Sequence, residues 1–162
     1  MKRELENNWE KRSEERSKTY ARYLKKVDAS RAIRSLPALH DVAFEHVDCL
    51  ACGNCCKGYS PRFKTPDIKR ISRLLNLKES DFIHQYLRLD EEGDYVAHTT
   101  PCPFLGKDNQ CSIYDDRPSD CARFPYTDED VFVKRPSITL KNVSFCPAAY
   151  LVIENLMEQL PA

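Results

Sequence analysis

The chain has 162 residues in which 25 basic side chains balance 25 acidic ones, so its length allows one domain and its charge provides no overall field to attract nucleic acid. Leu, Ile, Val and Phe supply only 37 residues, about 23% of the chain and close to the ~20% below which chains tend to be disordered. The longest apolar run, 148–153, is far shorter than the ~20 residues that cross a bilayer, so we expect no membrane-spanning segment.

Residues 1–27 are predicted to form a charged helical arm that precedes a cysteine-rich domain at 28–162. Strong helix formers dominate the arm, Gly and Pro are absent from it, and residues 1–26 carry nine basic against five acidic side chains. Its sparse apolar positions include Trp9, Tyr20 and Tyr23, which we expect to pack on the domain. The alternative is that this N-terminal helix binds a protein partner or nucleic acid.

Two stretches with helical spacing follow. Residues 28–47 are predicted to form one or two short helices around Pro37. Thr65-Pro66-Asp67 is typical of a helix start, because a Thr hydroxyl can cap the helix and proline is tolerated in the first turn. A second helix is predicted from about Ser80.

The remainder of the chain is expected to be less regular until its last segment. Residues 94–99 and 110–114 resemble short extended pieces, a helical turn is expected between Pro118 and Pro125, and residues 130–140 are predicted to be irregular or extended. A final helix is predicted from Pro147 to about Leu160. The expected fold is therefore mainly α with a short β-hairpin, a small single domain organised around a cysteine-rich metal centre.

Eight cysteines carry the chemistry of this sequence: Cys49, Cys52, Cys55, Cys56, Cys102, Cys111, Cys121 and Cys146. Two residues between cysteines let one backbone turn aim both sulfurs at one ion, and Gly53 permits the positive φ that such turns need. The amino terminus lacks the apolar run and cleavage site of an export signal, so we expect a cytoplasmic protein. Clustered cysteines there bind metal more often than they form disulfides, and all eight are candidate metal ligands. A disulfide-linked domain is the weaker alternative.

The adjacent pair Cys55 and Cys56 constrains the number of centres. Neighbouring side chains usually diverge, so the pair indicates two metal centres, a polynuclear cluster, or one ligand beside a structural thiol. Eight thiolates on two zinc ions would carry a net charge of about −4, against about −2 for four thiolates on a cubane iron–sulfur core. The candidate compensating charges are Lys57, Arg117, Arg123 and the helix N-terminus at Pro147. His46 and His98 lie near cysteines; we expect them to be ordinary histidines, and the alternative is that each binds the metal or orients a ligand.

Four ordered motifs resemble a known family. They are Cys49-x-x-Cys52-x-x-Cys55-Cys56, Cys102-Pro103-Phe104-Leu105, Cys111-Ser112-Ile113-Tyr114 with Arg117-Pro118, and Cys121-Ala122-Arg123-Phe124-Pro125. Over about residues 47–147 the chain resembles the CxxCxxCC family of zinc- or iron-chelating proteins. The resemblance implies that the cysteines chelate zinc or iron, an iron–sulfur cluster included, and that the metal organises the fold.

The alternative function is an iron–sulfur redox or group-transfer enzyme, or an accessory to one, with reactive cysteines. The four glycines form no G-x-G loop for a nucleotide or methyl donor, which argues against a transferase. Five further motif residues are expected to pack around the cysteines and set the angle between Cys111 and Cys121: Tyr114, Arg117, Pro118, Phe124 and Pro125.

Overall fold

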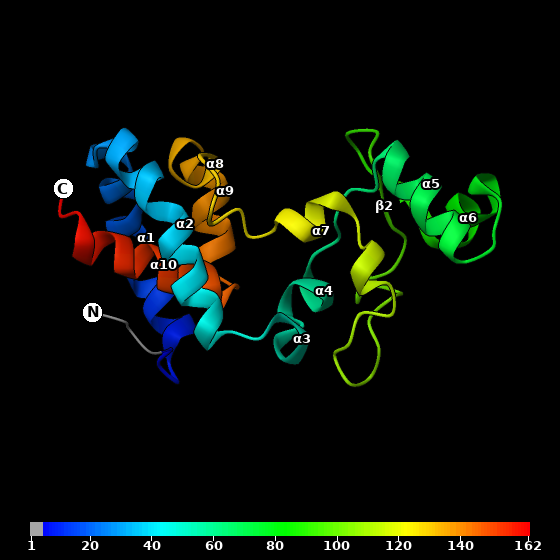
Figure 1. The fold of residues 1–162 in the computed structure, drawn as a ribbon, viewed down its shortest axis with the longest axis horizontal. Coiled ribbons are helices and arrows are strands. Elements are labelled where there is room, and N and C mark those ends of the chain that lie inside the picture. The colour runs from blue at the N-terminus through cyan, green and yellow to red at the C-terminus, as the bar shows by residue number, and fades with distance from the viewer. Residues whose placement is uncertain (1–4) are drawn as a thin grey trace. The chain divides into compact units, whose positions relative to one another are not determined.

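The computed structural model describes residues 5–162 and consists of two compact units (Figure 1). One unit is formed by the residues up to Asp48 together with Pro125–Ala162, and the other by Cys49–Phe124. The cysteine-rich stretch is thus inserted into the chain between the two halves of a helical unit. Within residues 5–162, none of the helices combines the length and the apolar character needed to cross a bilayer. The chain is mostly helical with one antiparallel hairpin, as the sequence predicts.

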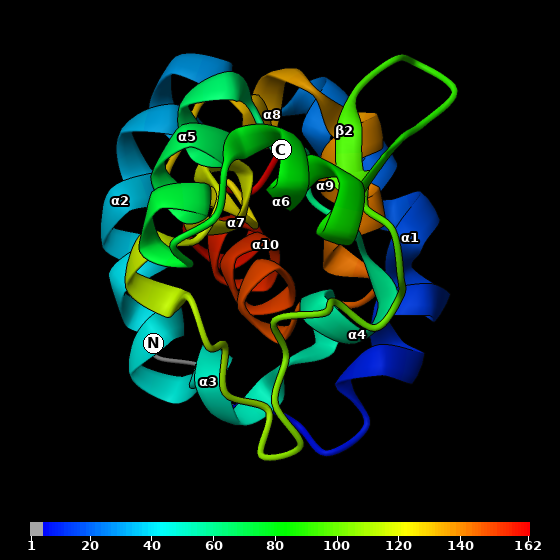
Figure 2. The same cartoon turned by 90° about the vertical axis from the view of Figure 1, so that its right-hand side faces the viewer.

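The helical unit is built around its last helix. Its members are α1 (Trp9–Lys26), α2 (Ala29–His46), α8 (Val131–Lys134), α9 (Pro136–Val143) and α10 (Pro147–Gln159). Every residue of α10 from Pro147 to Leu156 is buried, and α1, α2 and α9 pack around it (Figure 2). Helix formation by this segment is predicted correctly, because Pro147 stands in the first turn where its missing N–H is tolerated.

The N-terminal helix packs on this unit through its aromatic face, as expected. Trp9, Tyr20 and Tyr23 are buried, and Trp9 lies 5.9 Å from Tyr150 between ring centroids. The apolar side of α1 is therefore covered within the unit, and its charged side remains exposed. The boundary at residues 27/28 stays a prediction, because a compact unit is not the same as an independently folding domain.

Two segments of the helical unit differ in extent or type from expectation. α2 is a single helix of 18 residues that continues through Pro37. The prediction of irregular or extended chain over 130–140 is wrong, because α8 and α9 occupy that stretch. Pro136 begins α9, where proline needs no N–H partner, and the Thr139 hydroxyl donates a hydrogen bond of 2.7 Å to the carbonyl of Phe132.

The cysteine unit contains short elements: α3 (Cys49–Cys52), α4 (Asn54–Gly58), α5 (Thr65–Leu74), α6 (Glu79–Tyr86), β1 (Leu87–Leu89), β2 (Tyr95–Ala97), the 3-10 helix η1 (Tyr114–Asp116) and α7 (Ser119–Arg123). The predicted starts of α5, α6 and α7 are confirmed within one residue. The cap of α5 differs from expectation: Lys64 precedes the helix, and the Asp67 carboxylate accepts the Lys64 N–H at 3.0 Å.

The hairpin joins a different pair of segments from the one expected. β2 is one of the predicted extended pieces, but it pairs with β1 in an antiparallel register that sets Leu87 opposite Ala97. Residues 110–114 contribute only an isolated bridge between Cys111 and Leu105. The Asp90 side chain accepts the N–H groups of Glu92 and Asp94, which stabilises the tight connection between β1 and β2.

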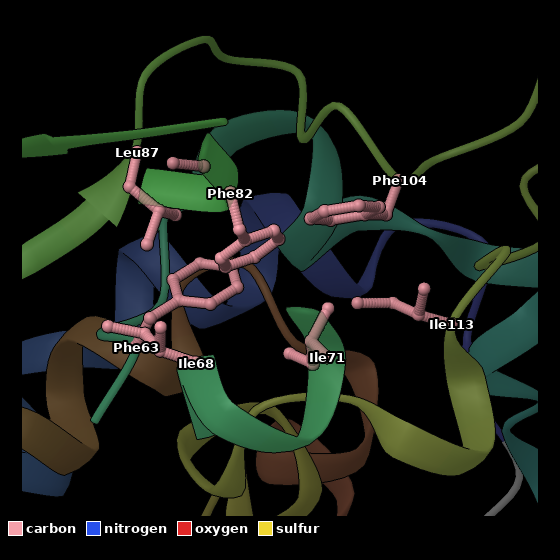
Figure 3. Close-up of a cluster of buried hydrophobic side chains, with 8 residues drawn as sticks. Phe63, Ile68, Ile71, Phe82, Leu87, Phe104 and Ile113 are labelled. Carbon is pink, nitrogen blue, oxygen red and sulfur yellow. The ribbon is translucent and has the colours of Figure 1, made fainter. Parts of the chain in front are cut away.

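A cluster of eight buried apolar side chains forms the core of the cysteine unit (Figure 3): Phe63, Ile68, Ile71, Phe82, Leu87, Ala97, Phe104 and Ile113. Phe104 stands two residues after Cys102, and Ile113 stands two residues after Cys111. Both cysteines pack against this cluster while remaining partly exposed. Burial of the two apolar side chains therefore anchors both cysteines at the edge of the core.

Candidate metal centre

The first cysteine segment is folded around Gly53. This residue has a φ of +60° and separates α3 from α4, which confirms the positive φ predicted for it. A Cβ at this position would lie 3.3 Å from the Cβ of Asn109, and the Asn109 side-chain amide donates a hydrogen bond of 3.1 Å to the carbonyl of Ala51. The turn around Asn109 is thus held directly against the segment that carries the first four cysteines.

The sulfurs of Cys55 and Cys56 lie 3.9 Å apart, so the expectation that they diverge is wrong. Two thiolates on one tetrahedral zinc, with Zn–S bonds of about 2.3 Å, would stand about 3.8 Å from each other. The hydrogen bond from the Cys55 thiol lowers the pKa of Cys56 to about 7, against an opposing effect of burial, and the charge of Lys57 adds to the lowering. The positive charge of Lys57 thus favours the thiolate of Cys56, in the compensating role predicted for it.

Three cysteines that are distant along the chain interact with Cys56. The Cys102 N–H donates a hydrogen bond of 2.8 Å to the carbonyl of Cys56. Burial raises the pKa of Cys102 to about 11, and the charges of Cys56 and Cys111 raise it too. Burial also raises the pKa of Cys121, and the charges of Cys56, Cys102 and Cys111 act in the same direction. Cys56, Cys102, Cys111 and Cys121 therefore interact electrostatically in the folded chain.

Positive charge is also placed beside this group. Burial raises the pKa of Cys111, and the Arg117 guanidinium opposes that effect. This guanidinium stands 4.0 Å from the centroid of the Tyr114 ring and donates a hydrogen bond of 2.7 Å to the Tyr114 carbonyl. Arg117 therefore has the compensating position predicted for it.

The other candidate residues differ in burial. Cys49 is exposed in α3, Cys52 is partly buried, and Cys146 is buried in the helical unit at the start of α10. His46 and His98 are exposed. No disulfide joins the eight cysteines.

The structure gathers thiols without forming a coordination sphere. In the part of the chain from residue 5 onward, no three His, Cys, Asp or Glu side chains converge closely enough to hold one ion. The chemistry of the donor set nevertheless fits zinc or iron, since thiolates are the ligands that bind these metals most strongly in proteins.

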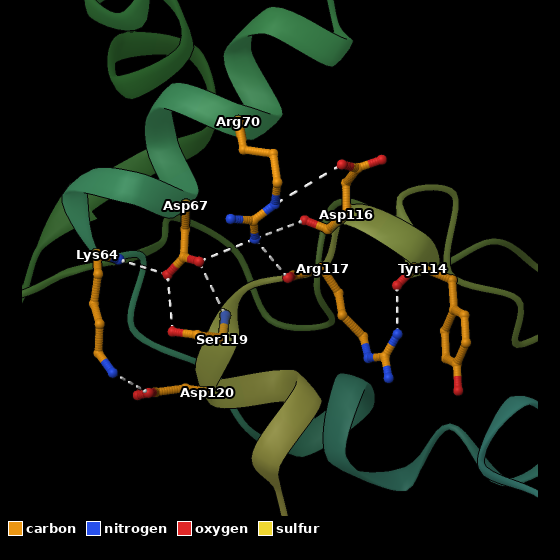
Figure 4. A network of polar contacts seen from close by, with 8 residues as sticks. All are labelled: Lys64, Asp67, Arg70, Tyr114, Asp116, Arg117, Ser119 and Asp120. Carbon is orange, nitrogen blue, oxygen red and sulfur yellow. Dashed lines mark hydrogen bonds and ion pairs between the residues drawn. The ribbon is translucent and has the colours of Figure 1, made fainter.

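A buried polar network connects α5 to the segment between Cys111 and Cys121 (Figure 4). The Asp67 carboxylate accepts hydrogen bonds from Lys64, Arg70 and Ser119. Asp120, next to Cys121, forms ion pairs of 2.9 Å with Arg62 and Lys64. Burial opposes ionisation of Asp120, but the two cations hold its pKa below the ordinary value. The sequence indicated Asp67 only as part of a helix start, because its partner Ser119 lies 52 residues away along the chain.

Comparison with known proteins assigns the chain to a family. A model described as "CxxCxxCC: Putative zinc- or iron-chelating domain" matches residues 48–146. No curated protein and no solved structure matches the chain. The matched region is more than half of the chain and includes all eight cysteines. The chain that gathers these thiols therefore belongs to the CxxCxxCC family, whose domain is described as zinc- or iron-chelating.

Proposed function

We propose that this protein binds zinc or iron through a thiolate centre made by Cys55, Cys56, Cys102, Cys111 and Cys121. The observation that carries the proposal is geometric: the Cys55 and Cys56 sulfurs lie 3.9 Å apart, and the Cys102 N–H donates a 2.8 Å hydrogen bond to the Cys56 carbonyl. In keeping with this, the charges of Cys56, Cys102 and Cys111 each raise the pKa of Cys121. Thiols that repel one another's negative charge are stabilised as thiolates by a bound cation. The membership of the family described as zinc- or iron-chelating supports the same function.

Cys49, Cys52 and Cys146 complete the proposed ligand set. The first two share the CxxCxxCC motif with Cys55 and Cys56, and all three lie within the matched region. Eight thiols exceed the four that a single tetrahedral zinc uses, so a polynuclear iron–sulfur centre is the second candidate. Such a centre would supply one-electron redox chemistry or assist group transfer. Both the zinc centre and the iron–sulfur centre need reduced thiols, which favours a cytoplasmic protein.

Metal analysis of the purified protein tests the proposal. The protein is prepared once in air and once with oxygen excluded, and each sample is analysed for zinc, iron, acid-labile sulfide and visible absorption. We expect stoichiometric zinc or iron. Zinc without colour supports simple chelation, whereas iron with sulfide and a brown colour that bleaches in air supports the iron–sulfur centre.

Single substitutions then test the ligands. Cys56→Ser and Cys121→Ser are expected to lower the metal content, because each removes one sulfur from the interacting group. Ser80→Ala, an exposed change in α6 of the same unit, is the matched control and should retain full metal. Metal-free protein from both preparations, or full metal in Cys56→Ser, would refute the proposal.

A further inference from the structure

We propose that Asp67 and Arg70 form a brace that positions Cys121 relative to Cys111 for metal binding; this inference rests on the proposed function. Neither residue is a ligand candidate, and both belong to α5 (Figure 4). Their partners lie in the nine-residue connection between the two cysteines. The brace therefore acts through the backbone that carries the sulfurs.

Asp67 is buried and receives four hydrogen bonds from groups that surround its carboxylate. Its exposed fraction is 2%. One oxygen accepts the Arg70 guanidinium and the Ser119 N–H, each at 3.0 Å, and the other accepts the Lys64 N–H at 3.0 Å and the Ser119 hydroxyl at 3.2 Å. A buried carboxylate with this many donors has one well-defined position, and it fixes the position of Ser119.

Ser119 is the first residue of α7, the five-residue helix that carries Cys121. The first N–H groups of a helix have no partner within the helix, and the N-cap residue of α7, Pro118, makes no side-chain capping hydrogen bond. Asp67 supplies that partner from 52 residues away. The ion pairs of Asp120 with Arg62 and Lys64 hold the next residue, so α7 is attached to the segment before α5 as well.

Arg70 holds the other part of the connection. Its guanidinium donates hydrogen bonds of 3.1 Å to the Asp116 carbonyl and 2.9 Å to the Arg117 carbonyl. Arg117 is the residue whose charge acts on Cys111. One guanidinium thus orients the segment that follows η1, and a lysine could not make the same forked contacts.

The experiment compares Co²⁺ binding by the wild-type chain and by Asp67→Asn. Cobalt reports thiolate coordination through its visible absorption, and competition with a chelator gives its affinity. Asn keeps one acceptor oxygen but presents an NH₂ group to donors on the other side. We expect Asp67→Asn to bind Co²⁺ about 10–100-fold more weakly, the range found when a group that orients metal ligands is lost. Ser119→Ala, which removes only the hydroxyl contact, should weaken binding less.

Two further variants separate positioning from folding. Arg70→Lys retains the charge and the apolar stem, so it serves if Asp67→Asn does not fold, and it too should weaken Co²⁺ binding. Glu154→Gln disturbs a buried carboxylate in the helical unit, where Tyr20 donates to it at 2.6 Å. It should lower thermal stability and leave the Co²⁺ affinity and spectrum unchanged. Wild-type affinity in both Asp67→Asn and Arg70→Lys would overturn the brace, whereas a wild-type chain that binds no Co²⁺ would overturn the proposed function itself.

Discussion

Replacing Gly53 by alanine is expected to damage the cysteine segment without removing a thiol. The left-handed conformation at this position costs an alanine about 1–2 kcal/mol. The new Cβ would also lie 3.3 Å from Asn109 and displace it. Displacement weakens the Asn109–Ala51 hydrogen bond, which is worth about 1 kcal/mol. We therefore expect Gly53→Ala to lower the free energy of unfolding by about 2–3 kcal/mol.

Two other glycines provide controls that separate strain from contact. Gly93 has a φ of +84° but nothing within 4 Å of its added Cβ, so Gly93→Ala should lose only the ~1–2 kcal/mol of strain. Gly58 lies at the end of α4 with an ordinary φ and nothing within 4 Å, so Gly58→Ala should change stability by no more than about 0.5 kcal/mol. The three glycines thus form a graded series.

Urea unfolding followed by circular dichroism measures this series, and chelator competition measures metal retention in the same samples. Gly53→Ala should be the least stable variant and should release metal most readily, because the strained position lies between Cys52 and Cys55. Gly93→Ala should retain metal like the wild-type chain. Equal stability of Gly53→Ala and Gly58→Ala would refute the reasoning.

Two predictions concern pH and metal removal. Burial raises the pKa of Tyr23 to about 12, so the folded state favours the neutral phenol, and this contribution is complete below about pH 10 and is lost as the pH rises from 10 to 12. Between pH 9 and 11, wild-type protein should lose about 1 kcal/mol more stability than Tyr23→Phe in urea titrations, and parallel curves would contradict this. Metal removal by a chelator should speed amide hydrogen exchange in 49–58 and leave α5 and α6 protected, and uniform loss of protection would contradict a local role of the metal.

Local signals in the sequence predicted those parts of the fold that depend on neighbouring residues. Pro66 and Pro147 identified helix starts, and Gly53 identified the turn between two cysteines, because each restricts or extends the backbone angles at its own position. The prediction of irregular or extended chain over 130–140 was wrong because Pro136 begins α9 there. The extended pieces predicted at 94–99 and 110–114 do not pair with each other. β2 pairs instead with β1, which lies nearer to it along the chain.

The candidate site was predictable only in part for a related reason. The motif spacing identified the cysteines as ligand candidates, and simple charge balance identified Lys57 and Arg117 as compensating charges. Asp67 could not be assigned its role, since its contact with Ser119 spans 52 residues and depends on the tertiary fold. Cys55 and Cys56 show the converse limit: the general divergence of neighbouring side chains did not predict their 3.9 Å separation.

The distribution of buried residues indicates where a bound metal would stabilise this chain most. The cysteine unit has an apolar core of its own, and Phe104 and Ile113 attach Cys102 and Cys111 to it. By contrast, α3 and α4 contain no buried residue, and they are held in part by the Asn109–Ala51 and Cys102–Cys56 hydrogen bonds. Apolar burial therefore positions the later cysteines before a metal arrives, whereas the segment with the first four needs metal–thiolate bonds to become equally stable. A bound metal is therefore expected to organise residues 49–58 more than the rest of the cysteine unit.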